Sequence, residues 1–170
     1  RAGLIGEVSA VTLTLNWDHT WTKGTPFEKI HHLVLYDFGI HWFDAACACF
    51  GNAPVKSVYA TVARAPGQTL APPLVASSVL TFAQGVATLN FDASSRFAPA
   101  ESVTVTGSLG TLRGTGAICA VPTLELTTAA GRARVELTGA WFNDGFRGTM
   151  GELLCAIEDG REPENSAAQN

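Results

Sequence analysis

The predicted fold is decided by the stretch Leu33-Val34-Leu35-Tyr36-Asp37-Phe38-Gly39-Ile40-His41-Trp42-Phe43-Asp44-Ala45-Ala46-Cys47-Ala48-Cys49-Phe50. Its apolar residues recur every three or four positions, which is the spacing of one face of an α-helix. Gly51-Asn52 follows as a suitable helix end. The expected inner stripe of this helix consists of Tyr36, Ile40, Phe43, Cys47 and Phe50.

Strands are predicted on both sides of this helix. Glu7–Trp17 alternates between apolar and polar residues, which indicates a half-buried strand. The links between the later strands are too short for helical crossovers, so the sheet should be mainly antiparallel. A last helix is predicted at Phe146–Glu158, and Gly160 ends it. The later strands are predicted at Val55–Arg64, Leu74–Phe82, Val86–Ala93, Ser102–Thr106, Thr111–Arg113, Thr123–Thr127 and Arg134–Thr138.

These elements predict an α+β fold with a large, mainly antiparallel, open-faced β-sheet and helices packed on one face. Two helices cannot cover both faces of so wide a sheet, so the face rich in Thr and Ser should stay open. We expect that face to bind another copy of the chain in a homo-oligomer. Residues 1–170 are interpreted as a single domain, which is a length sufficient for one core.

The composition excludes some classes of protein. Hydrophobic residues make up 46% of the 170 residues and charged residues 15%, which is typical of a folded body whose surface is partly covered by other protein. The net charge of −4 and the scattered Lys and Arg residues argue against a nucleic-acid partner. The uncharged run between Arg64 and Asp92 is broken by Pro and Gly, so no membrane span is expected. No secretion leader is visible, and we expect a cytoplasmic protein.

The candidate chemistry lies in the central stretch. On a helix Asp37, His41 and Asp44 share one face, because they are four and three residues apart. An imidazole can take the proton of an alcohol, and a neighbouring carboxylate can orient that imidazole and raise its pKa. Spacing alone leaves a plain surface or capping role open for all three residues. The first predicted strand ends near this helix with Asn16, Trp17 and His19.

Four segments, in the same order as in the family, resemble the C-terminal domain of the Gfo/Idh/MocA oxidoreductases, which include glucose–fructose oxidoreductase and inositol dehydrogenase. The first is Gly3-Leu4-Ile5-Gly6-Glu7-Val8, and the second is the pattern formed by Asp37, Gly39, His41 and Asp44. The third is the turn Gly107-Ser108-Leu109-Gly110-Thr111. The fourth runs from Phe146 to Pro163 and contains Gly148-Thr149-Met150 and Gly160-Arg161-Glu162-Pro163.

The resemblance implies a substrate-side domain of a dehydrogenase that acts on a sugar, a polyol or a related compound. It implies that His41 handles the proton of the substrate hydroxyl and that Asp37 is its partner, with Asp44 in support. It also implies that Asn16, Trp17 and His19 are candidate substrate contacts, because some family members contact sugar hydroxyls at this place. It also implies that NAD or NADP is held by an N-terminal Rossmann domain outside this chain, which we expect to be a fragment. Neither a cofactor-binding residue nor a metal ligand is expected within the chain.

Two departures from the family bear on this interpretation. The family's Glu-Lys-Pro motif belongs to the nucleotide domain, and here the only Glu-Lys is Glu28-Lys29, which Ile30 follows. The glycine-rich run Gly107–Gly116 is not a G-x-G-x-x-G fingerprint, and we interpret it as turns in a sheet.

Two other functions stay open on the sequence. The chain could be a non-catalytic binding or oligomerisation module of the same fold. It could also be a metal-dependent enzyme that uses Asp37 and His41 together with His31 or His32.

Overall fold

The computed structural model describes residues 3–51, 53–164 and 166. It divides into two compact units, Arg1–Glu136 and Leu137–Asn170, and each is described by itself. The single domain expected over residues 1–170 stays a prediction.

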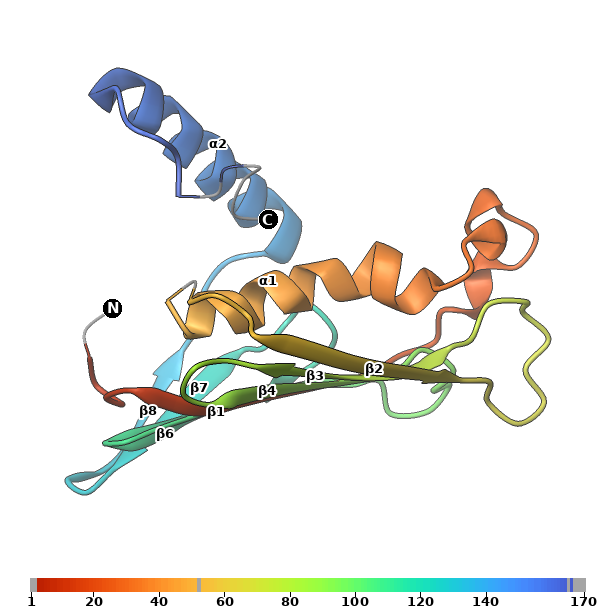
Figure 1. Ribbon diagram of the computed structural model, residues 1–170, viewed down its shortest axis with the longest axis horizontal. Coiled ribbons are helices and arrows are strands. Elements are labelled where there is room, and N and C mark those ends of the chain that lie inside the picture. The colour runs from red at the N-terminus through yellow and green to blue at the C-terminus, as the bar shows by residue number, and fades with distance from the viewer. Residues whose placement is uncertain (1–2, 52, 165, 167–170) are drawn as a thin grey trace. The chain divides into compact units, whose positions relative to one another are not determined.

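The first unit is built on one eight-stranded sheet in the order β2-β3-β4-β1-β5-β6-β7-β8 (Figure 1). Every neighbouring pair is antiparallel except β1 and β4, which are parallel. The prediction of an α+β fold with a mainly antiparallel open sheet is therefore confirmed. The strands are β1 Val8–Asn16, β2 Ser57–Ala63, β3 Val75–Thr81, β4 Val86–Asp92, β5 Ala100–Gly107, β6 Gly110–Gly116, β7 Thr123–Thr128 and β8 Gly131–Glu136.

The parallel pair arises from the segment that joins β1 to β2. This segment holds two short 3-10 helices, Thr20–Thr22 and Pro26–Lys29, then a π-helical turn, Val34–Phe38, and the helix α1, Gly39–Cys49. It crosses the sheet to the edge strand β2, and the hairpin strands β3 and β4 then fill the space back to β1.

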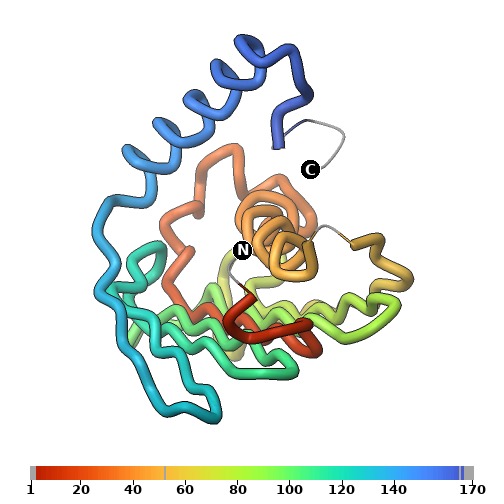
Figure 2. Tube along the Cα trace, turned by 90° about the vertical axis from the view of Figure 1, so that its left-hand side faces the viewer, coloured from red at the N-terminus to blue at the C-terminus, as the bar shows by residue number. Residues whose placement is uncertain are grey.

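The hydrophobic core lies between α1 and the strands β1, β3 and β4. Figure 2 shows α1 on one face of this sheet. Alternate residues of each strand point at the helix, so Leu13 of β1 lies beside Leu89 of β4, and Leu15 beside Phe91. The side chains that form the centre of the core are almost fully buried: Val11, Leu13, Leu15, Leu33, Val34, Trp42, Ala46, Leu80, Ala87, Leu89 and Phe91.

The inner stripe predicted for the helix is wrong at its N-terminal end. Tyr36 is 70% exposed and Ile40 is 51% exposed, whereas Val34, Trp42 and Ala46 are buried. The cause is the π-helical turn, in which the N–H of Gly39 bonds the carbonyl of Val34 five residues earlier. One extra residue in a turn rotates the positions on either side of it relative to each other.

Two of the glycine motifs pack against each other although they are a hundred residues apart. The backbone N–H of Ser108 donates to Glu7 and that of Leu109 to Ile5, both at 2.9 Å. A Cβ on Gly107 would lie 2.2 Å from the carbonyl oxygen of Ile5. Gly6 has a φ of +70°, which favours glycine, and a Cβ there would lie 2.3 Å from the hydroxyl oxygen of Ser108. Glycine at these two positions therefore allows the two backbone segments to pack closely.

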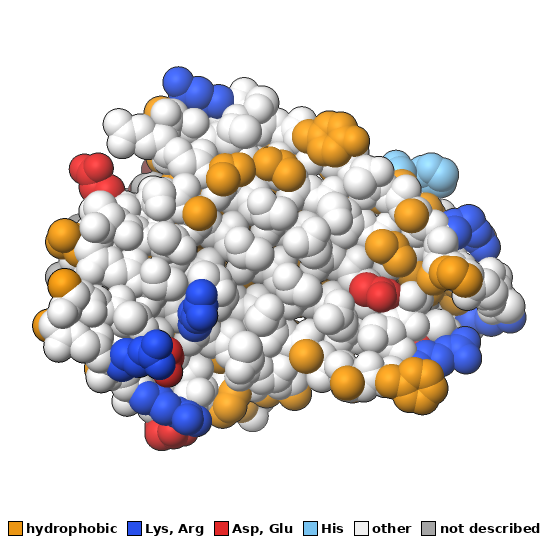
Figure 3. Space-filling view, turned by 90° about the horizontal axis from the view of Figure 1, so that it is seen from below, with side chains coloured by type: hydrophobic (Ala, Val, Ile, Leu, Met, Phe, Trp, Pro, Cys, Tyr) orange, Lys and Arg blue, Asp and Glu red, His pale blue; other side chains and the backbone are white. Residues whose placement is uncertain are grey.

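The sheet face opposite α1 is polar. The residues of β1 that alternate with the core include Thr12 and Thr14, and they lie opposite Thr104 and Ser102 of β5. Figure 3 looks at this face and shows mostly uncharged polar surface across its middle, with Lys and Arg side chains toward its ends. Within the first unit α1 covers only the other face, as expected for an open sheet.

The second unit consists of helix α2, Trp141–Asp159, and the turn that follows it. The helix begins five residues before the predicted start at Phe146, and the Asp144 carboxylate accepts a hydrogen bond from the backbone N–H of Ala140 at its N-terminus. Gly160 ends it in the left-handed conformation, with a φ of 63°. Arg161 then donates two hydrogen bonds to Glu152, at 2.6 and 3.1 Å, which lowers the pKa of that carboxyl to about 2.

Within the described part of the chain, neither helix combines the length and the apolar character that a membrane crossing requires.

Candidate functional site

The candidate site forms where β1 ends beside the π-helical turn. The chain continues past β1 in an extended form, with the N–H of Trp17 bonded to Asp92 and that of His19 to Ala93, both at 2.9 Å. This extension keeps the alternation of the strand, so the side chains of Trp17 and His19 are buried together with Leu15. The sequence pattern of the first strand thus positions two of the predicted site residues.

His19 lies at the centre of the site and is only 5% exposed. Its Nδ1 atom is 2.9 Å from the indole Nε1 of Trp17, which donates a hydrogen bond to it. Its Nε2 atom is 3.9 Å from Oδ2 of Asp37. Burial lowers the pKa of His19, and the negative charges of Asp37 and Asp18 oppose this shift without reversing it.

Aromatic rings surround His19. The centroid of the Trp21 ring lies 5.1 Å from that of His19, and Phe38 lies 4.3 Å from Trp17. Phe38 also stacks on Trp42 at 4.9 Å. Trp42 is buried in the core. Sequence reasoning did not identify Trp21 and Phe38 as part of this site, because neither belongs to a polar motif.

Asp37 and His41 lie on successive parts of the helical segment. Asp37 is in the π-helical turn, and 34% of its side chain is exposed. His41 is exposed in the first turn of α1, with its ring 6.0 Å from that of Trp42. Gly39 lies between them, and a Cβ there would be 3.1 Å from the carbonyl oxygen of Val34 and 3.3 Å from the Phe43 ring. A larger residue would therefore be crowded at the junction of the two helices.

Asp44 is exposed on α1, one turn beyond His41. Its charge is the smaller of two causes that raise the pKa of Cys47, after burial of the thiol. The structure describes no interaction between Asp44 and Asp37, so the supporting role of Asp44 stays a prediction.

Asn16 is separated from the other candidates. It alternates with Leu15 and Trp17, so it lies on the polar face of the sheet, away from α1. The structure therefore brings Trp17, His19 and Asp37 together and leaves Asn16 outside this group.

A hollow of about 490 Å³, lined by polar and apolar residues alike, opens beside Thr20, the residue after His19. Asp92, Ser94 and Arg96 are among the residues that line it. The adjoining loop is held by Asp18, whose carboxylate accepts hydrogen bonds from the hydroxyl and the backbone N–H of Thr20, at 2.6 and 2.9 Å. These two bonds lower the pKa of Asp18.

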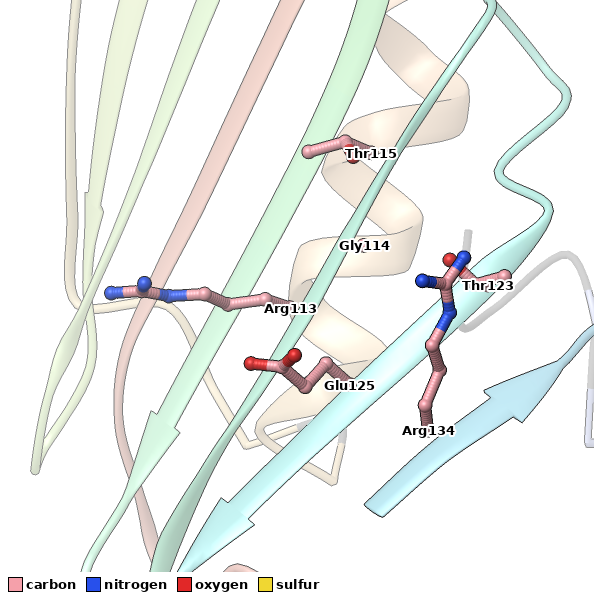
Figure 4. A pocket seen from close by; sticks show the side chains of 6 residues that line it. All are labelled: Arg113, Gly114, Thr115, Thr123, Glu125 and Arg134. Carbon is pink, nitrogen blue, oxygen red and sulfur yellow. The ribbon is translucent and has the colours of Figure 1, made fainter. Parts of the chain in front are cut away.

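A second hollow, of about 260 Å³, lies on the polar face of the sheet (Figure 4). Its centre is a row of cross-strand neighbours, Arg113 on β6, Glu125 on β7 and Arg134 on β8. The carboxylate of Glu125 lies between the two arginine side chains in Figure 4. The hollow belongs to the open face and contains none of the predicted site residues.

The glycine-rich run of the sequence lies in the sheet. The glycine-rich run Gly107–Gly116 forms the end of β5, a turn and the strand β6, which confirms that it opens no helix. Among the described residues, no group of three or more His, Cys, Asp or Glu side chains could hold a metal ion. His31 and His32 are exposed, with ring centroids 4.4 Å apart.

Comparison with protein families gives one match. The family described as the GFO/IDH/MocA C-terminal domain matches residues 1–113. This range includes the first three of the four motif segments and leaves out the segment from Phe146 to Pro163. No curated protein matches the sequence.

Solved structures share the fold. An oxidoreductase from Agrobacterium radiobacter, in complex with NAD+, L-tartaric acid and magnesium, matches with a TM-score of 0.79 and 18% identity, over 99% of this chain and 52% of that one. Levoglucosan dehydrogenase, in complex with NADH and levoglucosan, matches with a TM-score of 0.77 and 14% identity, over 96% and 53%. UDP-N-acetylglucosamine 3-dehydrogenase from Acidithiobacillus ferrooxidans matches with a TM-score of 0.70 and 18% identity, over 93% and 47%. The chain thus spans about half the length of these structures.

Proposed function

The chain belongs to the GFO/IDH/MocA family, as a C-terminal domain of that family, and from this premise we propose that it is the substrate-side domain of an NAD(P)-dependent oxidoreductase. The substrate that we propose is a sugar, a polyol or a related compound. The ligands in two of the similar structures, L-tartaric acid and levoglucosan, are hydroxylated compounds. They support an alcohol as the reacting group.

We assign the proton of the substrate hydroxyl to Asp37 and His41. The observation that carries this proposal is the position of both residues on one helical segment, where β1 ends and a buried histidine already faces Asp37 at 3.9 Å. His41 is exposed and can reach a substrate that lies outside the core. As the base it takes the hydroxyl proton, while the carboxylate of Asp37 favours the protonated imidazole that forms.

The nicotinamide belongs outside this chain in our proposal. When bound, it supplies the acceptor for the hydride that leaves the substrate carbon. The described residues offer no strand–G-x-G-x-x-G–helix element, so the partner that holds NAD or NADP is the protein's own N-terminal domain. The work of this chain is then to bind and orient the alcohol and to remove its proton.

Calorimetry tests this division of labour. We expect residues 1–170 alone to give no heat of binding with NAD+, NADH, NADP+ or NADPH. The full-length protein is expected to bind either NAD+ and NADH or NADP+ and NADPH. It should reduce the oxidised form while it oxidises a polyol. Saturable dinucleotide binding by residues 1–170 would contradict the proposal.

We further propose that the polar sheet face joins copies of the protein in a homo-oligomer. Its support is the row of threonine side chains across β1 and β5 and the charged row Arg113, Glu125 and Arg134, which two copies can pair with each other. Sedimentation equilibrium of the full-length protein is expected to give a mass that is a multiple of the single chain. A monomer at micromolar concentration, in the presence and absence of dinucleotide, would exclude it.

A further inference from the structure

The protons of Trp17 and His19 can be assigned from their contact. An indole N–H is a donor only, and Nε1 of Trp17 lies 2.9 Å from Nδ1 of His19. Nδ1 must therefore be the acceptor and carry no proton. A neutral imidazole holds its single proton on the other nitrogen, so the proton of His19 is on Nε2.

The Nε2–H group of His19 has no partner of its own. Nε2 is one of the buried side-chain atoms for which the described structure offers no hydrogen-bond partner. Oδ2 of Asp37 is the facing acceptor, but the distance of 3.9 Å is too long for a direct hydrogen bond. One oxygen atom could lie about 2.9 Å from both Nε2 of His19 and Oδ2 of Asp37, and its two hydrogen bonds would then form roughly a right angle.

The electrostatic surroundings keep His19 neutral. The charged groups that face it are Asp37, from the π-helical turn, and Asp18, from the extension of β1. The rings of Trp17, Trp21 and Phe38, which also lie beside His19, carry no charge. Burial outweighs the two carboxylates and lowers the pKa of His19, so its Nε2 is a neutral donor at pH 7.

We propose that Trp17 is a positioning residue that fixes His19 as the neutral Nε2–H tautomer, and that His19 and Asp37 together hold one hydroxyl oxygen of the substrate. His19 donates to that oxygen, and the hydroxyl donates to the carboxylate of Asp37. This hydroxyl neighbours the reacting one, whose proton His41 takes, so the contact orients the substrate in the site. The second half of this inference rests on the proposed function, whereas the tautomer of His19 does not.

Nitrogen NMR of the 15N-labelled chain measures the tautomer without any substrate. Long-range 1H–15N correlations separate protonated from unprotonated ring nitrogens, and we expect His19 to show Nε2 protonated and Nδ1 unprotonated at pH 7. Trp17→Phe removes the indole N–H and keeps an aromatic ring. We expect the Nδ1–H tautomer of His19 to appear in this variant beside the Nε2–H form.

Trp42→Phe is the matched control, because it makes the same chemical change in the same aromatic cluster and leaves the Trp17–His19 bond in place. We expect His19 to keep a single tautomer in this variant. An Nδ1-protonated or doubly protonated His19 in the unsubstituted chain would overturn the assignment. An unchanged tautomer in Trp17→Phe would exclude the positioning role.

Kinetics of the full-length protein test the hydroxyl contact. Trp17→Phe is expected to lower kcat/KM for the alcohol by about 2- to 10-fold, the effect of one uncharged hydrogen bond, whereas Trp42→Phe leaves it unchanged. An unchanged kcat/KM in a Trp17→Phe protein whose tautomer has shifted would refute the contact. An unsubstituted protein that oxidises no alcohol would instead refute the proposed function, and the tautomer measurement would be unaffected.

Discussion

In the full-length protein, His41→Ala lowers kcat/KM for the alcohol substrate by about 10²–10⁴-fold, the usual contribution of a positioned acid or base. The reason is that the hydroxyl proton then has no acceptor in the proposed position as the hydride departs. The substitution is at an exposed side chain, so the fold should persist. Steady-state formation of NADH or NADPH, followed by absorbance over a range of alcohol concentrations, gives the value.

His32→Ala is the matched control for this prediction. It removes an exposed imidazole from the chain just before the same helical segment, and we expect kcat/KM to stay within about twofold of the unsubstituted value. Turnover that survives His41→Ala would favour the non-catalytic binding or oligomerisation module. Loss of turnover in both variants, together with stoichiometric zinc or manganese, would favour the metal-dependent enzyme.

Phe91→Ala is expected to lower the free energy of unfolding by about 3–5 kcal/mol, which is the usual cost of truncating a buried phenylalanine. Phe91 is 1% exposed, and it contacts the rings of Trp17 and Phe43. Its removal leaves a cavity beneath Gly39, at the junction of the π-helical turn and α1. Urea unfolding of residues 1–170, followed by tryptophan fluorescence, measures the change.

Phe97→Ala provides the comparison for Phe91→Ala. Phe97 is 86% exposed, and its truncation should change the free energy of unfolding by less than about 0.5 kcal/mol. Equal effects of the two substitutions would show that Phe91 does not lie in the core that the structure describes.

The sequence was sufficient for the strands because each one carries its own local signal. The alternation in Glu7–Trp17 predicts both the strand and the residues that face the core, and Leu13, Leu15 and Trp17 are buried as expected. The short links correctly predicted antiparallel pairing from β2 to β4 and from β5 to β8, whereas β1 lies between β4 and β5. The parallel pair β1 and β4 could not be predicted in this way, because it depends on how far the helical segment carries the chain across the sheet.

The helical segment was predicted less completely than the strands. Its place in the sequence was correct, yet its buried face was not, since Tyr36 and Ile40 are exposed. A regular period of 3.6 residues was assumed for the whole segment, and the π-helical turn at Val34–Phe38 breaks that period. Gly39 was the available signal, because a glycine inside a helical pattern often has a packing reason.

The contacts of the candidate site residues could not be predicted from the sequence. Spacing suggested Asp37 with His41, whereas the contact that the structure describes for Asp37 is with Nε2 of His19, 18 positions earlier in the chain. That contact joins the extension of β1 to the π-helical turn. A local sequence pattern cannot predict it, because the two segments meet only in the folded protein. The alternation of the first strand did hold the information that separates Asn16 from Trp17, because the two residues point to opposite faces.

The pH dependence of kcat/KM in the full-length protein tests the proton-transfer claim most directly. A histidine base loses its function as it is protonated, so the unsubstituted protein should lose kcat/KM as the pH falls. We predict that this acidic limb disappears in His41→Ala and that added imidazole restores part of the lost rate. The same acidic limb in both proteins, with no response to imidazole, would contradict the account.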